Sequence, residues 1–211
     1  MAAYIVAITG ASGAVYGLRL IDALLKRGDD VELIISPSGF LILKEELGIV
    51  ASASDAGCVC LQYLESAWLG KRTGALSAAP SDCLSASSAS GSSVKSGMIV
   101  CPCSMGTLAR IAGGCSTNLI ERAADCFLKE RRRLIVVPRE TPLNAIHLEN
   151  MLRLSRAGAV ILPAMPAFYT MPKTVGDMVD FVVGKTLDCL GIENGLYKRW
   201  GKDTVNRDRE P

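Results

Sequence analysis

The chain has 211 residues, of which 49% are hydrophobic and 21% are charged, and this composition is typical of a globular protein rather than a disordered one. The formal charge is only +2, so bulk electrostatics do not indicate a nucleic acid or a membrane surface as a partner. No apolar run approaches the ~18 residues of a membrane span. The first residues run into glycines without the basic leader of a signal peptide, so we expect a cytoplasmic protein.

The eight cysteines include two close pairs, Cys58/Cys60 and Cys101/Cys103, both with C-x-C spacing. Zinc sites usually show tighter, repeated ligand spacing, and the only histidine, His147, is far along the chain from either pair. We therefore expect no metal site and interpret the cysteines as reduced, partly buried thiols.

Apolar runs alternate with stretches of helical periodicity along the chain. The first two runs lack polar alternation, as expected of strands covered by helices on both faces. In chain order we expect a strand over 4–9, a helix over 14–26, a strand over 31–35, a helix over 40–47, a strand over 98–101, helices over 104–112 and 118–128, a strand over 134–137, a helix over 145–156, a strand over 159–162 and a helix over 175–190.

This alternation predicts an α/β fold with one doubly wound parallel sheet and helices on both faces. The Ser- and Ala-rich stretch over 77–97 reads as a linker by its composition alone. No internal repeat or domain boundary is evident. We expect a single domain over 1–200, followed by a charged tail over 201–211.

Ligands bind such sheets outside the carboxyl ends of the strands. Distinctive residues follow nearly every predicted strand, and their convergence at one edge is the main reason to expect a site there. They are Gly10–Gly13, Ser36, Cys101–Thr107, Pro138–Glu140 and Pro163–Tyr169.

The first of these loops, Gly10–Gly13, lets the backbone approach a ligand closely and aims the amides of a helix N-terminus at an anion. It lacks the second glycine of G-x-G-x-x-G, and the second strand ends in Ser36 rather than in an acid that would hold an NAD ribose. A mononucleotide phosphate therefore fits better than NAD. A tight turn without a ligand is the alternative.

A second candidate cradle, Pro102–Thr107, places two hydroxyls at the start of a helix, where free amides and the dipole favour a phosphate. Simple N-capping by Ser104 is the alternative. Two such turns in one sheet favour a phosphate-bearing ligand more than either turn does separately.

Cations lie near these turns: Arg122, Lys129 and Arg139, the last followed by Glu140. A phosphate leaving group needs cations to absorb its charge, and a nearby carboxylate can move protons. The alternatives are a solvated helix end around Lys129 and a surface ion pair for Glu140.

Phe168, Tyr169 and Trp200 are scarce aromatic residues whose faces attract cations, including a developing carbocation. The alternative is packing in the core or at an interface, which is favoured for Phe168.

Several ordered motifs together resemble the UbiX family of flavin prenyltransferases, with coverage of about residues 4–200. The family's opening is matched by Thr9–Ala14 with Tyr16-Gly17, and its prenyl-phosphate loop by Ser90–Ser93. The remaining matches are Cys101–Leu108, Asn118–Asp125, Leu128–Arg132, Val137–Pro142, His147-Leu148, Gly158–Ile161, Pro166–Tyr169 and Arg199-Trp200.

The resemblance implies a flavodoxin-like Rossmann subunit, assembled into a dodecamer with the site near subunit contacts. It implies a metal-independent enzyme that joins the dimethylallyl group of dimethylallyl phosphate to N5 and C6 of reduced FMN. The product, prenylated FMN, would serve a UbiD-like decarboxylase, in ubiquinone biosynthesis or in aromatic acid degradation.

The resemblance also implies roles for individual residues. Glu140 would transfer protons, with Glu46 as a second carboxylate, and Lys129 would stabilise the departing phosphate. Trp200 and Tyr169 would shelter the allylic cation. FMN would be held by Gly10, Ala11, Ser12, Ser36, Ser104, Met105, Thr107 and Arg139. Dimethylallyl phosphate would be held by Ser90, Gly91, Arg122, Lys129, Tyr169 and Lys185.

Two other functions share the fold and the FMN residues. FMN-dependent cysteine decarboxylases use a histidine near an early helix and an Asn in a Pro-x-Met-Asn turn, whereas this chain has only His147 and reads Pro163–Pro166 at the turn. A non-catalytic flavin carrier would not need Lys129, Glu140 and Tyr169.

Overall fold

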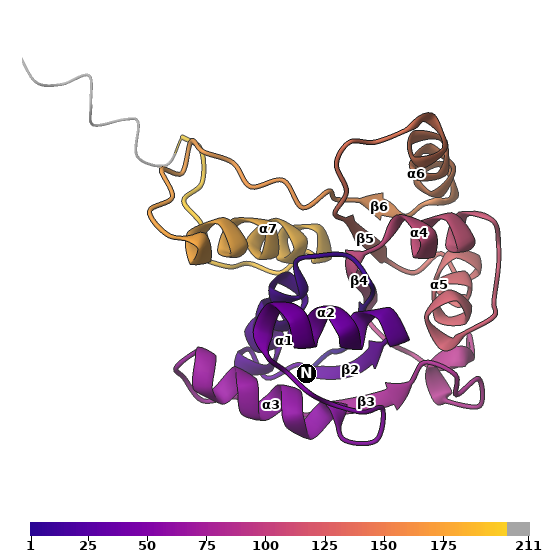
Figure 1. Cartoon of the computed structure of the whole chain (residues 1–211), viewed down its shortest axis with the longest axis horizontal. Helices are drawn as coiled ribbons and strands as arrows, with labels where there is room; N and C mark the ends of the chain where they lie inside the picture. The colour runs from indigo at the N-terminus through magenta and orange to yellow at the C-terminus, as the bar shows by residue number, and fades with distance from the viewer. Residues whose placement is uncertain (202–211) are drawn as a thin grey trace, which may run out of the picture.

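The fold is built on a sheet of six parallel strands in the order β3-β2-β1-β4-β5-β6 (Figure 1). The computed structural model describes residues 1–201, so the expected tail lies outside the described residues from 202 onward. The order is that of a doubly wound Rossmann sheet, in which the winding reverses between β1 and β4. The strands are β1 (Ala3–Ile8), β2 (Asp30–Ile35), β3 (Leu76–Pro80), β4 (Gly97–Cys103), β5 (Leu134–Pro138) and β6 (Val160–Ile161).

Helices cover both faces of the sheet, which confirms the predicted fold class. One face carries α1 with α2, α3 and α7, and the other carries α4 with α5 and α6 (Figure 1). Within residues 1–201 no helix has the length and apolar character needed to cross a bilayer. The helices are α1 (Ala14–Lys26), α2 (Pro37–Leu47), α3 (Ala56–Ala67), α4 (Met105–Ala112), α5 (Leu119–Lys129), α6 (Ala145–Ala157) and α7 (Val175–Leu190), with a 3-10 turn, η1, at Ser87–Ala89.

The continuous apolar runs are explained by burial on two sides. In β1, Val6 and Ile8 belong to the core under α1, whereas Ile5 and Ala7 belong to the core under α4 and α5. Gly17 lets α1 lie close to the sheet, because a Cβ there would come within 2.3 Å of the Cys101 carbonyl oxygen. Successive residues thus bury on opposite faces, and no polar alternation remains in the sequence.

All the predicted helices and strands are present, with boundaries shifted by a few residues. The helix expected over 40–47 starts at Pro37, because Ser36 caps it and a proline is favoured in the first turn. In α7, Val179, Val182 and Val183 are buried, whereas Val175 in the first turn is 76% exposed.

Two elements were not predicted. Helix α3 buries only Ala56, Cys60 and Leu64, a stripe too weakly apolar to stand out in the sequence. Strand β3 occupies the start of the Ser/Ala-rich stretch that reads as a linker. It pairs only with β2 and is an edge strand, a place that tolerates Pro80. Its strand geometry depends on the neighbouring strand rather than on its own composition.

A buried carboxylate ties α1 to α3 and α7. The Asp22 side chain is fully buried and accepts hydrogen bonds from Arg19 (2.6 Å), Lys26 (2.8 Å) and Arg72 (2.5 Å). Arg19 also binds Asp180 of α7. Arg72 also donates to two carbonyls at the C-terminal end of α3, Leu64 and Trp68.

We predict that Asp22→Asn lowers the free energy of unfolding by ~3 kcal/mol or more, because it leaves three cations without their buried counter-charge. Urea denaturation followed by circular dichroism measures the change. The matched control is Asp82→Asn at an exposed position, which should shift stability by no more than about 0.5 kcal/mol. An equal effect of both variants would show that Asp22 has no special role.

Candidate active site

The loops after β1, β4 and β5 meet at the carboxyl edge of the sheet. The Thr9 hydroxyl donates to the Pro102 carbonyl (2.9 Å) and accepts from the Ser104 amide (2.8 Å). The Nε of Arg139 donates to the Ser12 carbonyl (3.2 Å). The two candidate phosphate-binding turns, Gly10–Gly13 and Pro102–Thr107, therefore lie next to each other and to Arg139.

The first turn is shaped by close contact with the start of α2. A Cβ on Gly10 would come within 2.4 Å of the Ser38 Cβ, so glycine is required for the turn to pack there. Ser36 accepts a hydrogen bond from the Gly39 amide (3.0 Å) and caps α2. The carboxyl ends of β1 and β2 thus form one compact wall.

The N-terminus of α1 is already occupied by a carboxylate from this chain. Glu46 of α2 accepts hydrogen bonds from the amides of Gly13 (2.9 Å) and Ala14 (3.0 Å). Two of the amides that the loop was expected to aim at a phosphate are therefore bound by a carboxylate of the chain itself. These contacts place the Glu46 carboxylate beside the Gly10–Gly13 loop.

The second turn keeps more of its donors available. Ser104 caps α4 by accepting from the Thr107 amide (3.3 Å), as the N-capping alternative expects. The amides of Met105 and Gly106 in the first turn have no intrahelical acceptor. Capping therefore leaves a cluster of donors at this helix start, next to the Thr107 hydroxyl.

The thiols of Cys101 and Cys103 lie beneath this turn and are not reactive groups. Both are buried, and burial raises the pKa of Cys101 strongly and that of Cys103 to about 12. They remain protonated near neutral pH and act as small core residues. All eight cysteines are free thiols, as expected.

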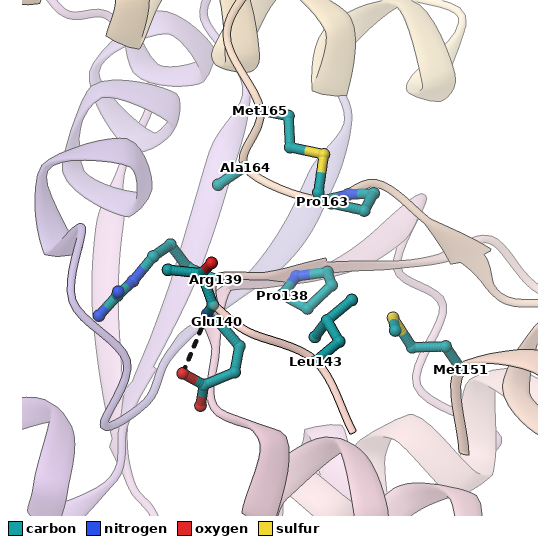
Figure 2. Close-up of a pocket in the computed structure, with 9 residues that line it drawn as sticks. Pro138, Arg139, Glu140, Leu143, Met151, Pro163, Ala164 and Met165 are labelled. Carbon is teal, nitrogen blue, oxygen red and sulfur yellow. Dashed lines mark hydrogen bonds between the residues drawn. The ribbon is translucent and has the colours of Figure 1, made fainter. Parts of the chain in front are cut away.

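A cavity of about 260 Å³ opens beside Glu140 (Figure 2). Arg139 and Glu140 leave the chain in different directions, with the Glu140 carboxylate accepting only from the Thr141 amide (3.1 Å) among the described residues. The surface ion pair considered for Glu140 is therefore not observed. The wall is mostly apolar and is formed by Pro138, Arg139, Glu140, Thr141, Leu143, Met151, Pro163, Ala164 and Met165.

The expected donor-binding residues Ser90, Gly91, Arg122 and Lys129 lie together along α5. Arg122 donates to the Ala89 carbonyl (3.1 Å), and a Cβ on Gly91 would come within 2.8 Å of the Lys129 Nζ. Lys129 pairs with Glu130 in solvent, as the helix-end alternative expects.

The other expected donor-binding residues, Tyr169 and Lys185, lie at α7 with Trp200. The Tyr169 ring packs edge-on against Trp200 (5.2 Å) and Phe181 (5.9 Å). Phe168 is 71% exposed, so its expected packing does not occur within one protomer.

The predicted residues therefore form three groups. The expected FMN residues and both carboxylates gather around the carboxyl edge of the sheet. The donor residues divide between α5 and α7, which cover opposite faces of the sheet (Figure 1). One protomer does not bring these two groups together.

Sequence reasoning missed Asp188, which organises the α7 group. Its carboxylate accepts from Tyr197 (2.5 Å), Arg199 (2.7 Å) and Asn194 (3.0 Å), and it lies 3.8 Å from the Lys185 Nζ. Its partners follow in an irregular segment, so no periodic pattern marks them.

The residues fit a flavin mononucleotide. Gly10 leaves no room for a Cβ, the α4 start presents donors, and the terminal nitrogens of Arg139 have no partner among residues 1–201. A single phosphate suits these groups, and the apolar cavity suits a ring system. No group of three or more His, Cys, Asp or Glu side chains in the described chain is arranged to hold a metal ion.

Phosphate cradles at the carboxyl edge of a doubly wound sheet, without dinucleotide glycine spacing, define a mononucleotide-binding protein. Comparison with known proteins agrees, since the flavoprotein family model matches residues 2–187. The flavin prenyltransferase UbiX of Halalkalibacterium halodurans is 52% identical over 98% of this chain and 97% of its own length. This chain belongs to the UbiX family of flavin prenyltransferases.

Two solved structures share the fold closely. AnUbiX (PadA1), in complex with FMN and dimethylallyl pyrophosphate, is 39% identical with a TM-score of 0.83, covering 94% of this chain and 97% of its own. A dodecameric FMN-dependent UbiX-like decarboxylase from Escherichia coli O157:H7 is 40% identical with a TM-score of 0.81, covering 94% and 98%.

We predict that acid releases the segment that carries Trp200. Burial pushes the pKa of Asp188 up, but hydrogen bonds from Arg199 and Tyr197 outweigh burial and hold it below the ordinary carboxyl value. The stabilisation is therefore present at neutral pH and is lost as the pH falls through the lowered pKa, below about 4. Trp200 fluorescence in a Trp68→Phe background follows the release.

In the same background, Asp188→Asn should show the released spectrum already at neutral pH. Glu193→Gln, at an exposed position nearby, should behave as the parent does. A parent-like spectrum for Asp188→Asn at neutral pH would show that Asp188 does not hold the segment.

Proposed function

We propose that this protein transfers the dimethylallyl group of dimethylallyl phosphate to reduced FMN and releases prenylated FMN. The observation that carries the proposal is the convergence of Gly10, Ser104, Arg139 and Glu140 at one sheet edge. Family membership supports it, and so does the solved relative that holds FMN with dimethylallyl pyrophosphate.

In this proposal the carboxyl edge binds FMN. The phosphate lies against the α4 start and the free end of Arg139, where partial and full positive charges meet. Gly10, Ala11, Ser12 and Ser36 form the opposite wall. Reduced FMN supplies N5 and C6, the atoms that receive the dimethylallyl carbons.

Cations of this chain assist departure of the phosphate group. The C–O bond of the donor breaks and its electron pair leaves with the phosphate, so negative charge grows on the phosphate oxygens. Arg122, Lys129 and Lys185 would stabilise that charge. The faces of Tyr169 and Trp200 would stabilise the allylic cation.

Glu140 is the proposed proton-transfer residue. It lines the cavity, and its carboxylate has only one hydrogen bond within residues 1–201, so it can accept another group's proton. Glu46 is held by two backbone amides and is placed to bias the charge at the first turn rather than to move freely.

A neighbouring subunit completes the site in this proposal. The donor residues at α5 and at α7 lie on opposite faces of one protomer, and the Escherichia coli relative is dodecameric. Large apolar side chains are also exposed around α6 and before α7, as expected of surfaces covered in an assembly. They include Ile146, Leu148, Leu152, Phe168, Met171 and Val175.

We propose that the product passes to a UbiD-like decarboxylase in the cytoplasm. Eight free thiols are typical of a reducing compartment. Ubiquinone biosynthesis is one pathway that such a decarboxylase would serve.

We predict that the protein with reduced FMN and dimethylallyl phosphate, kept anaerobic, yields a flavin heavier by one dimethylallyl unit. Mass spectrometry of the extracted flavin measures this gain. A flavin carrier would bind FMN without the gain, and a cysteine decarboxylase would instead release carbon dioxide from a cysteine peptide. No gain from folded, FMN-loaded protein would overturn the proposal.

We predict that Glu140→Gln binds FMN as the parent does but slows turnover by ~100-fold or more, because the amide cannot transfer a proton. Flavin fluorescence titration and anaerobic single-turnover assays measure the two properties. Glu149→Gln, an exposed carboxylate on α6, is the matched control. Parent-like turnover in Glu140→Gln would assign Glu140 a structural role.

A further inference from the structure

The segment over 87–93 is held against α5 through its backbone carbonyls. The Ala89 carbonyl accepts from Arg122 (3.1 Å) and from the Cys126 thiol (3.2 Å). Arg132, just beyond α5, binds the other two: its Nη1 donates to the Ser93 carbonyl (2.6 Å) and its Nη2 to the Gly91 carbonyl (2.7 Å). Three alternate carbonyls are thus bound by side chains of α5 and of Arg132, just beyond it.

These hydrogen bonds change which groups of the 87–93 segment are available to bind an anion. Carbonyl oxygens repel phosphate oxygens, and here the Gly91 and Ser93 oxygens are each bound by a guanidinium nitrogen. The Ser90 hydroxyl hydrogen-bonds the Ser92 hydroxyl (2.8 Å), and Lys129 lies against Gly91 together with its ion-pair partner Glu130. With the Gly91 and Ser93 carbonyls engaged, the turn presents the Ser90 hydroxyl beside the Lys129–Glu130 ion pair.

We propose that Arg132 is a positioning residue for the phosphate of the prenyl donor. By binding two carbonyls with one planar fork, it holds Ser90 and Gly91 in the conformation that receives the phosphate next to Lys129. The proposal rests on the proposed prenyl transfer and adds a residue that has no direct contact with the donor.

The geometry requires arginine at this position. The two acceptors lie two residues apart and are reached by the two terminal nitrogens of one rigid group. A lysine ammonium is a single point and would hold one carbonyl at a time. The preceding residue, Arg131, carries the same charge, but its side chain makes no hydrogen bond or ion pair within residues 1–201; its amide donates only to the Leu128 carbonyl (3.1 Å). Comparing the two arginines therefore separates the effect of charge from that of geometry.

The segment has an independent anchor on its other side. The buried carboxylate of Glu32 accepts from the Ser88 hydroxyl (2.8 Å) and lies 3.2 Å from the Lys95 Nζ. Loss of Arg132 is therefore expected to loosen the turn over 90–93 without unfolding its flanks.

The test compares Arg132→Gln, Arg132→Lys and the charge-matched control Arg131→Gln. Steady-state assays give KM for dimethylallyl phosphate and kcat, and flavin fluorescence titration gives the Kd for FMN. We expect Arg132→Gln to raise the donor KM ~10-fold, with kcat and the FMN Kd within about twofold of the parent. Arg132→Lys should recover only part of the loss, and Arg131→Gln should stay near the parent.

Three results would overturn the proposal while the parent enzyme is active. They are an unchanged donor KM in Arg132→Gln, an equal rise in Arg131→Gln, which would assign the effect to long-range charge, or a parallel loss of FMN binding, which would assign it to general structure. Failure of the parent itself to prenylate FMN would instead overturn the proposed function.

Discussion

The hydroxyl of Thr9 joins the ends of the first and fourth strands, donating to the Pro102 carbonyl and accepting from the Ser104 amide. These strands are neighbours at the point where the winding of the sheet reverses, and the loops that follow them diverge to opposite faces. A crevice must form between such loops. The Thr9 hydrogen bonds hold the two loops together. The hydrogen bond from Arg139 to the Ser12 carbonyl attaches the loop after β5 to the loop after β1.

The two strand-to-helix turns at the sheet edge differ in which charged groups lie beside them. Glu46 binds the Gly13 and Ala14 amides at the α1 start, and the proposed function accordingly places the ligand phosphate at the α4 start and at Arg139. A phosphate placed beside Glu46 would face a like charge, whereas one at α4 meets donors and a cation. The two similar strand-to-helix turns therefore differ in their surroundings, because a carboxylate from α2 lies against only one of them.

The residues proposed to bind the donor are held in place by neighbouring side chains. Arg132 holds the turn that contains Ser90 and Gly91, and Asp188 holds the segment next to Lys185 and Trp200. Both supports act through several hydrogen bonds from one rigid or buried group. Two preorganised half-sites on opposite faces are suited to an assembly in which one subunit completes the other.

The sequence alone determined the doubly wound fold, since apolar runs, helical periodicity and capping residues are local properties. It also identified Gly10, Ser104, Arg139 and Glu140, because parallel strands bring their carboxyl ends to one edge wherever the helices lie. It did not identify β3, whose strand geometry comes from pairing with β2, or Asp188 and Arg132, whose partners are carbonyls and side chains without sequence signature. Only the tertiary structure decided that Glu46 caps α1 and that the donor residues separate, because hydrogen-bond partners and sheet faces are set by packing between distant segments.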